Sequence, residues 1–133
     1  MTIRRVVPDI SSAVLGQSRQ FYQRLGLVEV MNLGWVITLA SPTHPTAQVT
    51  LMGPDATAAI QPDVTIEVDD VDAVHAAMVE HGAPIVHPLQ DESWGVRRFF
   101  VTDPNGRVTN VVGHHGARVI GRDSPARAPR RDG

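Results

Sequence analysis

The sequence predicts an α+β protein built from two βαβββ modules. Helical periodicity appears at only two places, β-rich runs fill most of the remaining chain, and the order strand, helix, three strands occurs twice between residues 3 and 115. An internal repeat of this kind usually means two copies of one unit packed together. We expect modules at residues 1–53 and 62–115, a linker at 54–61 and an Arg-rich flexible tail at 116–133. A chain of 133 residues suits one such domain.

The first module begins with the β-rich run "IRRVVPDI". Ser11 or Ser12 can cap the helix that follows, whose apolar residues recur at helical spacing until Gly26 ends it. Three β-rich runs separated by Gly, Asn and Pro complete the unit: "LVEVMNLGW", "VITLAS" and "QVTLMG".

The second module repeats this order. The strand "DVTIEVDD" ends in two Asp residues that favour a helix start, an apolar helix face follows, and Gly82 closes it. The strands "PIVHPL", "VRRFFVT" and "RVTNVVGH" come next, with a turn at 103–106 between the last two.

Composition excludes several classes of function. The chain has no Cys, which rules out disulfides, thiolate metal sites and a Cys nucleophile. A net charge of −2 gives no general attraction to nucleic acid, and no segment approaches membrane-spanning length. The N-terminal segment lacks the apolar core of a signal peptide, so we expect a cytoplasmic protein with no nucleic-acid or membrane partner.

Three segments in order resemble the vicinal oxygen chelate superfamily, which includes glyoxalase I, bleomycin-resistance proteins and extradiol dioxygenases. They are "SRQFYQRLGLVEV", "VTIEVDDVDAVHAAMVEHGAPIVHPL" and "WGVRRFFVTDPNGRVTNVV". The resemblance covers residues 3–113. It implies an open, curved mixed sheet whose concave face forms a cup for a small molecule, and a homodimer.

Enzymes of this superfamily hold a divalent metal with one side chain, usually His or Glu, from the first and the last strand of each module. By the resemblance, Asp63 and Asn110 fall at these positions in the second module. Thr50 falls at the last-strand position of the first module, and the first-strand position falls near residues 2–4. One carboxylate and one amide make a poor site for Zn, Ni or Fe, so we expect no metal cofactor.

The strand pairing expected across the 103–106 turn sets Asn110 opposite Phe99, with Arg97 on the same face. By the resemblance this face is concave, so all three side chains would point into the cup. Alternatively, Asn110 hydrogen-bonds a neighbouring strand end or a buried water, and Arg97 pairs with an acid such as Glu67. Trp35 and Trp94 offer apolar surface to a ligand, although both also suit packing within the protein.

The leading functional hypothesis is a metal-free protein of the bleomycin-resistance kind that sequesters a drug or metabolite, anionic or aromatic, in the cup. Its expected ligand-binding residues are Trp35, Thr50, Asp63, Glu67, Trp94, Arg97, Phe99 and Asn110. The alternative is a lyase, isomerase or dioxygenase acting on a small oxygenated substrate, with Glu67 or Asp63 in acid–base work. A third hypothesis is a dimerisation module whose cup is vestigial.

Overall fold

The computed structural model describes residues 2–55 and 57–114 and contains both expected modules. The Arg-rich tail, which we expect to be flexible, lies outside the described residues. No helix in the described part of the chain is long and apolar enough to cross a membrane. The elements are β1 (Ile3–Ser11), α1 (Leu15–Arg24), β2 (Val28–Asn32), β3 (Val36–Ala40), β4 (Gln48–Met52), β5 (Val64–Val68), α2 (Val71–Glu80), β6 (Ile85–Asp91), β7 (Val96–Thr102) and β8 (Val108–His114).

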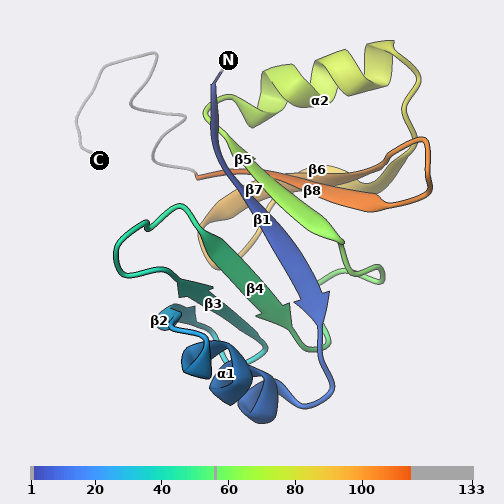
Figure 1. Cartoon of the computed structure of the whole chain (residues 1–133). Coiled ribbons are helices and arrows are strands. Elements are labelled where there is room, and N and C mark those ends of the chain that lie inside the picture. Colours follow the sequence, from blue (N-terminus) through green and yellow to red (C-terminus); the bar gives the residue numbers. More distant parts are fainter. Residues whose placement is uncertain (1, 56, 115–133) are drawn as a thin grey trace.

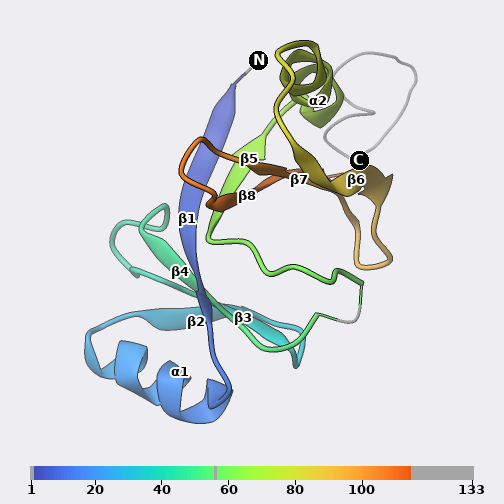
Figure 2. The same cartoon turned by 90° about the vertical axis from the view of Figure 1, so that its right-hand side faces the viewer.

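The eight strands form one open mixed sheet in the order β2-β3-β4-β1-β5-β8-β7-β6. Within each module the first and last strands are parallel neighbours, β1 with β4 and β5 with β8. The modules join at the centre, where β1 and β5 pair antiparallel. Figure 1 shows the two halves with one helix at each end of the molecule, and Figure 2 shows the segment between β4 and β5 running from one half to the other. The predicted fold class is confirmed.

Each helix packs on one face of the strands of its own module, which we call the outer face. The opposite face, the inner face, is not covered by either helix. Two apolar clusters hold these layers together. Under α2 the buried members are Val68, Val71, Phe99, Val101 and Val111. Under α1 they are Ile37, Leu39 and Leu51, against which Leu15 and Tyr22 pack.

The starts of the two helices can be compared with the N-caps predicted from the sequence. Asp70 caps α2, because its Oδ1 accepts a hydrogen bond from the Ala73 backbone N–H at 3.1 Å, as predicted. The predicted Ser cap of α1 is wrong. Strand β1 runs on through Ser11, the N-cap residue is Val14, and no side chain caps it. Ser12 Oγ instead accepts a hydrogen bond from the Val14 backbone N–H at 3.0 Å.

The β7–β8 hairpin turns at the predicted place, but its pairing differs by one residue. Asp103 Oδ1 accepts hydrogen bonds from the backbone N–H groups of Asn105 and Arg107, and Thr102 pairs with Val108. Arg107 therefore belongs to the loop as well, and Phe100 rather than Phe99 lies opposite Asn110. A shift of one residue moves every side chain of a strand to the other face.

Candidate functional site

The inner face of the sheet encloses a cavity of about 350 Å³, lined by side chains from both modules. Its position on the concave face agrees with the cup expected from the sequence. Most of its wall is apolar or aromatic, a composition typical of small-molecule sites. The larger apolar side chains in it are Met31, Leu33, Trp35, Met52 and Trp94.

The two Trp residues of the chain lie together in this wall. Trp35 comes from the first module and Trp94 from the second, and their ring centroids are 5.4 Å apart at an interplanar angle of 74°. Such an edge-to-face contact is favourable between aromatic rings. The wall is therefore aromatic where the modules meet.

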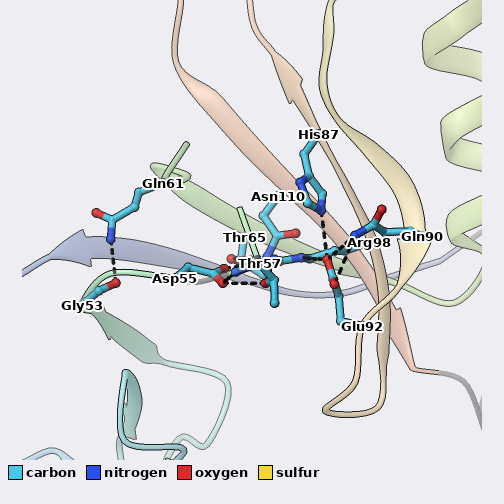
Figure 3. Close-up of polar contacts among 10 residues, drawn as sticks. All are labelled: Gly53, Asp55, Thr57, Gln61, Thr65, His87, Gln90, Glu92, Arg98 and Asn110. Atoms are coloured by element: carbon cyan, nitrogen blue, oxygen red, sulfur yellow. Dashed lines mark hydrogen bonds and ion pairs between the residues drawn. The ribbon is translucent and has the colours of Figure 1, made fainter. Parts of the chain in front are cut away.

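The floor of the cup is a short hydrogen-bonded chain across the central strands. Thr65 Oγ1 donates to Asp9 Oδ2 at 2.6 Å, and Asn110 Nδ2 donates to Thr65 Oγ1 at 3.1 Å. Asp9 is level with Thr50 on the β1–β4 pair, and Thr65 is level with Asn110 on the β5–β8 pair. Figure 3 shows Thr65 and Asn110 pointing toward one another.

This chain fixes the orientation of the Asn110 amide. When Asp9 is ionised, the Thr65 hydroxyl gives its one proton to Asp9, so toward Asn110 it can only accept. The amide nitrogen of Asn110 must face Thr65, and its carbonyl oxygen, Oδ1, faces elsewhere. Within the described residues, Oδ1 of Asn110 is the one buried side-chain nitrogen or oxygen with no hydrogen-bond partner. Leaving a buried acceptor unpaired costs about 1–3 kcal/mol.

Asp9 is a buried carboxyl group with an altered acidity. Burial raises the pKa of the Asp9 carboxyl to about 7, and the neighbouring charge of Asp63 acts in the same direction. The hydrogen bond from Thr65 and the positive charge of Arg5 lower that pKa but do not outweigh burial. Asp9 therefore changes its charge near neutral pH.

One side of the cup is held by a buried ionic network around Arg98, which is 2% exposed. Its Nε lies 2.7 Å from Glu92 Oε2, and its Nη2 lies 3.0 Å from Asp55 Oδ2 (Figure 3). His87 Nε2 lies 2.9 Å from the same Glu92 oxygen. The guanidinium carbon of Arg98 also sits 4.8 Å from the ring centroid of Trp94, so the network positions a wall residue of the cavity.

The two carboxylates of this network stay ionised. Burial opposes their charge, but hydrogen bonds outweigh it. Those from Thr57 and Arg98 hold the pKa of Asp55 below its usual value. Those from Arg98 and His87 do the same for the pKa of Glu92. Since Asp55 lies between β4 and β5, the network also ties this connecting segment to β7.

A second charged group lies at another edge of the cavity. Arg5 Nε is 2.5 Å from Glu67 Oε1, and His114 Nε2 is 3.4 Å from Glu67 Oε2. Arg5 also hydrogen-bonds Gln48. Glu67 therefore pairs with an Arg, as one alternative expected, but the partner is Arg5 and not Arg97.

The structure brings four of the residues predicted from the sequence to the cavity wall: Trp35, Thr50, Trp94 and Asn110. The other four predicted residues do not line it. Glu67 lies beside it, paired with the lining residue Arg5. Arg97 points to the outer face and pairs with Asp72 of α2 at 2.9 Å. Phe99 packs in the cluster under α2, and the one-residue error in strand pairing explains both differences.

The position expected for Asp63 is also wrong. Asp63 is exposed and precedes β5, and its Oδ2 accepts a hydrogen bond from the Val108 backbone N–H at 2.8 Å. Thr65, two residues later, is the β5 residue paired with Asn110. In the first module the cup position belongs to Asp9 and not to residues 2–4, because β1 continues to Ser11.

These corrected positions allow a test of whether the cup suits a divalent metal. The central strands present one carboxylate, two hydroxyls and one amide, from Asp9, Thr50, Thr65 and Asn110. The part of the chain that the structure describes has no cluster of three or more His, Cys, Asp or Glu able to hold a metal ion. Zn, Ni and Fe favour imidazole, thiolate and several anionic ligands. The donor set does not fit such an ion.

Among the residues that sequence reasoning missed are three on which the floor and wall of the site depend: Asp9, Thr65 and Arg98. A signal for Asp9 was present, because a carboxylate that alternates with Val7 and Arg5 along one face of a central strand needs a polar environment. Arg98 had no comparable signal, because it is adjacent to Arg97 and only the pairing decides which of the two faces inward.

Comparison with solved structures supports the fold. A glyoxalase/bleomycin resistance protein/dioxygenase superfamily member from Vibrio splendidus 12B01 is 21% identical, with a TM-score of 0.62 over 84% of this chain and 99% of its own. Methylmalonyl-CoA epimerase from Streptomyces coelicolor is 17% identical, with a TM-score of 0.61 over 86% and 99%. A Legionella pneumophila protein described as NAD-dependent benzaldehyde dehydrogenase is 13% identical, with a TM-score of 0.67 over 82% and 98%.

Sequence comparison gives two results. No curated protein matches the chain. The family model described as Glyoxalase/Bleomycin resistance protein/Dioxygenase superfamily matches residues 6–111, which include most of both modules and every residue of the cup floor. The chain therefore belongs to the Glyoxalase/Bleomycin resistance protein/Dioxygenase superfamily.

Proposed function

We propose that this protein is a metal-free small-molecule-binding protein that sequesters a drug or metabolite in the cup. One observation carries the proposal. The cup combines an aromatic wall with a floor whose polar groups bond to one another and include a single carboxylate, Asp9. Sequestration needs shape, apolar surface and a few placed polar groups, all of which this cavity supplies.

The wall favours a ligand with an aromatic or apolar frame. Trp35 and Trp94 offer ring surface, and Met31 and Met52 add adaptable side chains around it. The family match supports a small-molecule ligand in general terms, since bleomycin resistance proteins are part of the superfamily.

The protein is also proposed to form a homodimer. Edge strand β2 is exposed along its whole length, and Val30 on it is 56% exposed. Leu25, which follows the last residue of α1, is 67% exposed. An uncovered apolar edge strand favours association with another chain. Light scattering should give the mass of a dimer. A monomer mass at all protein concentrations would refute the proposed dimer.

Asp9 favours an enzymatic alternative, metal-free proton transfer on a bound substrate. A carboxyl group with a pKa of about 7 can both accept and release a proton at neutral pH. Glu67 is a weaker candidate for this role, because Arg5 already pairs with it at 2.5 Å. Conversion of a ligand that is lost in an Asp9→Asn variant would favour the enzyme over the binding protein.

Tryptophan fluorescence tests the binding function directly, because both Trp residues of the chain line the cavity. A panel of aromatic compounds is titrated into the protein, and the ligand is recovered and analysed afterwards. We expect a saturable change in emission and an unchanged ligand. Trp35→Ala should weaken binding, whereas Phe21→Ala, an exposed change on α1, should leave it intact.

Metal content tests the other half of the proposal. The protein is purified without a His tag after growth with Zn, Ni, Co, Mn and Fe, and its metals are measured by mass spectrometry. We expect substoichiometric amounts of each. A stoichiometric amount of one metal that is lost in an Asp9→Ala variant would refute a metal-free cup.

A further inference from the structure

We propose that the cup selects amines on an aromatic frame, with the ammonium group donating hydrogen bonds to the Asp9 carboxylate and to Asn110 Oδ1 while the ring lies against the Trp wall. This inference rests on the proposed binding function and names its ligand class. It reverses the expectation of an anionic ligand that Arg97 suggested, because Arg97 lies outside the cup.

The first support is the unpaired oxygen of Asn110. The residue is 9% exposed, lines the cavity, and has its amide nitrogen committed to Thr65. Its Oδ1 can only accept a hydrogen bond, so the missing partner must be a donor. A carboxylate group has no proton to offer there at neutral pH and would leave this oxygen unpaired.

The second support is the charge balance of the cup. The Arg5 guanidinium pairs with Glu67, and the Arg98 guanidinium pairs with both Glu92 and Asp55. Asp9 has a hydrogen bond from Thr65 but belongs to no ion pair within residues 2–55 and 57–114. Of the charges lining the cavity, the Asp9 carboxylate is thus the one that a ligand can still neutralise.

Each neighbour of Asp9 bears on this balance. Arg5, on the same strand face, favours the carboxylate form, and Asp63 disfavours it. Thr65, from β5, donates to it. His114, at the far end of β8, is half exposed and lies 3.4 Å from Glu67 rather than from Asp9. An ammonium ligand would add a positive charge next to a buried carboxyl group that burial, with a smaller contribution from Asp63, keeps partly protonated.

The wall completes the match to an aromatic amine. A phenyl ring gains apolar contact with Trp35 and Trp94, and indole rings attract nearby cations through their electron-rich faces. The same wall gives no such attraction to an anion. Ring and amine are therefore recognised by different surfaces of one cavity.

Three probes of similar size separate these effects: 2-phenylethylamine, 2-phenylethanol and 3-phenylpropionate. Their dissociation constants are measured by calorimetry and by Trp emission excited where phenyl groups do not absorb. At pH 8 we expect the amine to bind at least about tenfold more tightly than the carboxylate, with the alcohol between them. Amine affinity should rise by up to about tenfold per pH unit below neutrality and level off above it, because binding requires the ionised Asp9.

Two variants and a control show which residues produce the preference for the amine and its pH dependence. Asp9→Asn should flatten the pH dependence and remove most of the preference for the amine over the alcohol. Asn110→Leu should weaken the amine and the alcohol but not the carboxylate. Glu80→Gln changes an exposed carboxylate at the end of α2, outside the cavity, and should reproduce the wild-type values. Circular dichroism of each variant confirms that it is folded.

Each outcome separates this inference from the proposed function. Equal binding of the three probes, or tighter binding of the carboxylate, would overturn the inference and leave the binding function standing. The same holds if none of the three binds while other aromatic compounds do. Failure of the whole aromatic panel would overturn the binding function, and this inference with it.

Discussion

Replacing Asp9 by Asn should make the protein more stable at alkaline pH than the wild type, although the change deletes a charged residue from a central strand. Asp9 is 9% exposed, and its pKa rises from 3.8 to about 7 on folding, mainly through burial. An Asn side chain keeps the acceptor for the Thr65 hydroxyl and carries no charge. The variant therefore removes the cost of an ionised carboxyl group in the floor of the cup.

The magnitude follows from the difference between the two pKa values. The native state holds the Asp9 proton more tightly than the unfolded chain, so the stability of the wild type falls as pH rises from about 4 to about 7. At 1.36 kcal/mol per pH unit, the full loss is roughly 4 kcal/mol. Between about pH 5 and about pH 8.5, roughly 3 kcal/mol of it should be observed.

Urea unfolding followed by Trp fluorescence measures this loss. The free energy of unfolding is determined for wild type and Asp9→Asn at about pH 5 and about pH 8.5, and the difference between the proteins is compared at the two pH values. All ionisable groups other than Asp9 are common to both proteins, so their contribution to the pH dependence cancels. Equal pH dependence in wild type and variant would refute the reasoning, because Asp9 would then be ionised in the native protein without a penalty.

Three further predictions concern the packing around the cup. Arg98→Met should lower the free energy of unfolding by about 3–5 kcal/mol, because it leaves Glu92 and Asp55 buried without their cation. Arg97→Met, on the outer face with a partly exposed pair, is the matched control and should cost less than about 1 kcal/mol in the same urea titration. Phe99→Ala should cost about 3–5 kcal/mol yet leave the dissociation constant of any cup ligand within about twofold, since this ring packs under α2. Acid should weaken the Arg98 network: the lowered pKa values of Asp55 and Glu92 stabilise the native state above about pH 4, and this stabilisation disappears as pH falls through the native values. An acid titration of unfolding should show this loss in the wild type and a smaller one in Arg98→Met, and identical acid profiles would contradict it.

The sequence predicted the fold well because the fold depends on local patterns repeated twice. Alternation, helix spacing, the Asp70 cap and the 103–106 turn are each encoded within a few residues. The site depends on pairing between distant strands, which these patterns do not determine. Whether the hairpin loop ends at Gly106 or Arg107 decides whether Arg97 or Arg98 faces the cup, and the local sequence is compatible with either register.

The floor of the cup shows the same limit. The expected first strand includes Asp9, but no local pattern shows that Asp9 lies level with Thr50, because this depends on how β1 packs beside β4 and β5. Thr50, Trp94 and Asn110 could be predicted from the family resemblance, which carries information about tertiary position that composition and periodicity lack.

The hydrogen bond between Thr65 and Asp9 crosses the seam between the repeats, where β1 and β5 pair. The Trp35–Trp94 contact crosses the same seam on the wall. Neither repeat alone therefore forms the cup, which exists only where the two copies pack together. A ligand bound in the cup would contact both repeats and oppose their separation. At a free ligand concentration one hundred times the dissociation constant, it would add about 2.7 kcal/mol to the free energy of unfolding. Ligand binding in the cup and the joining of the repeats are thus thermodynamically coupled, and a change that weakens the β1–β5 pairing should also weaken ligand binding.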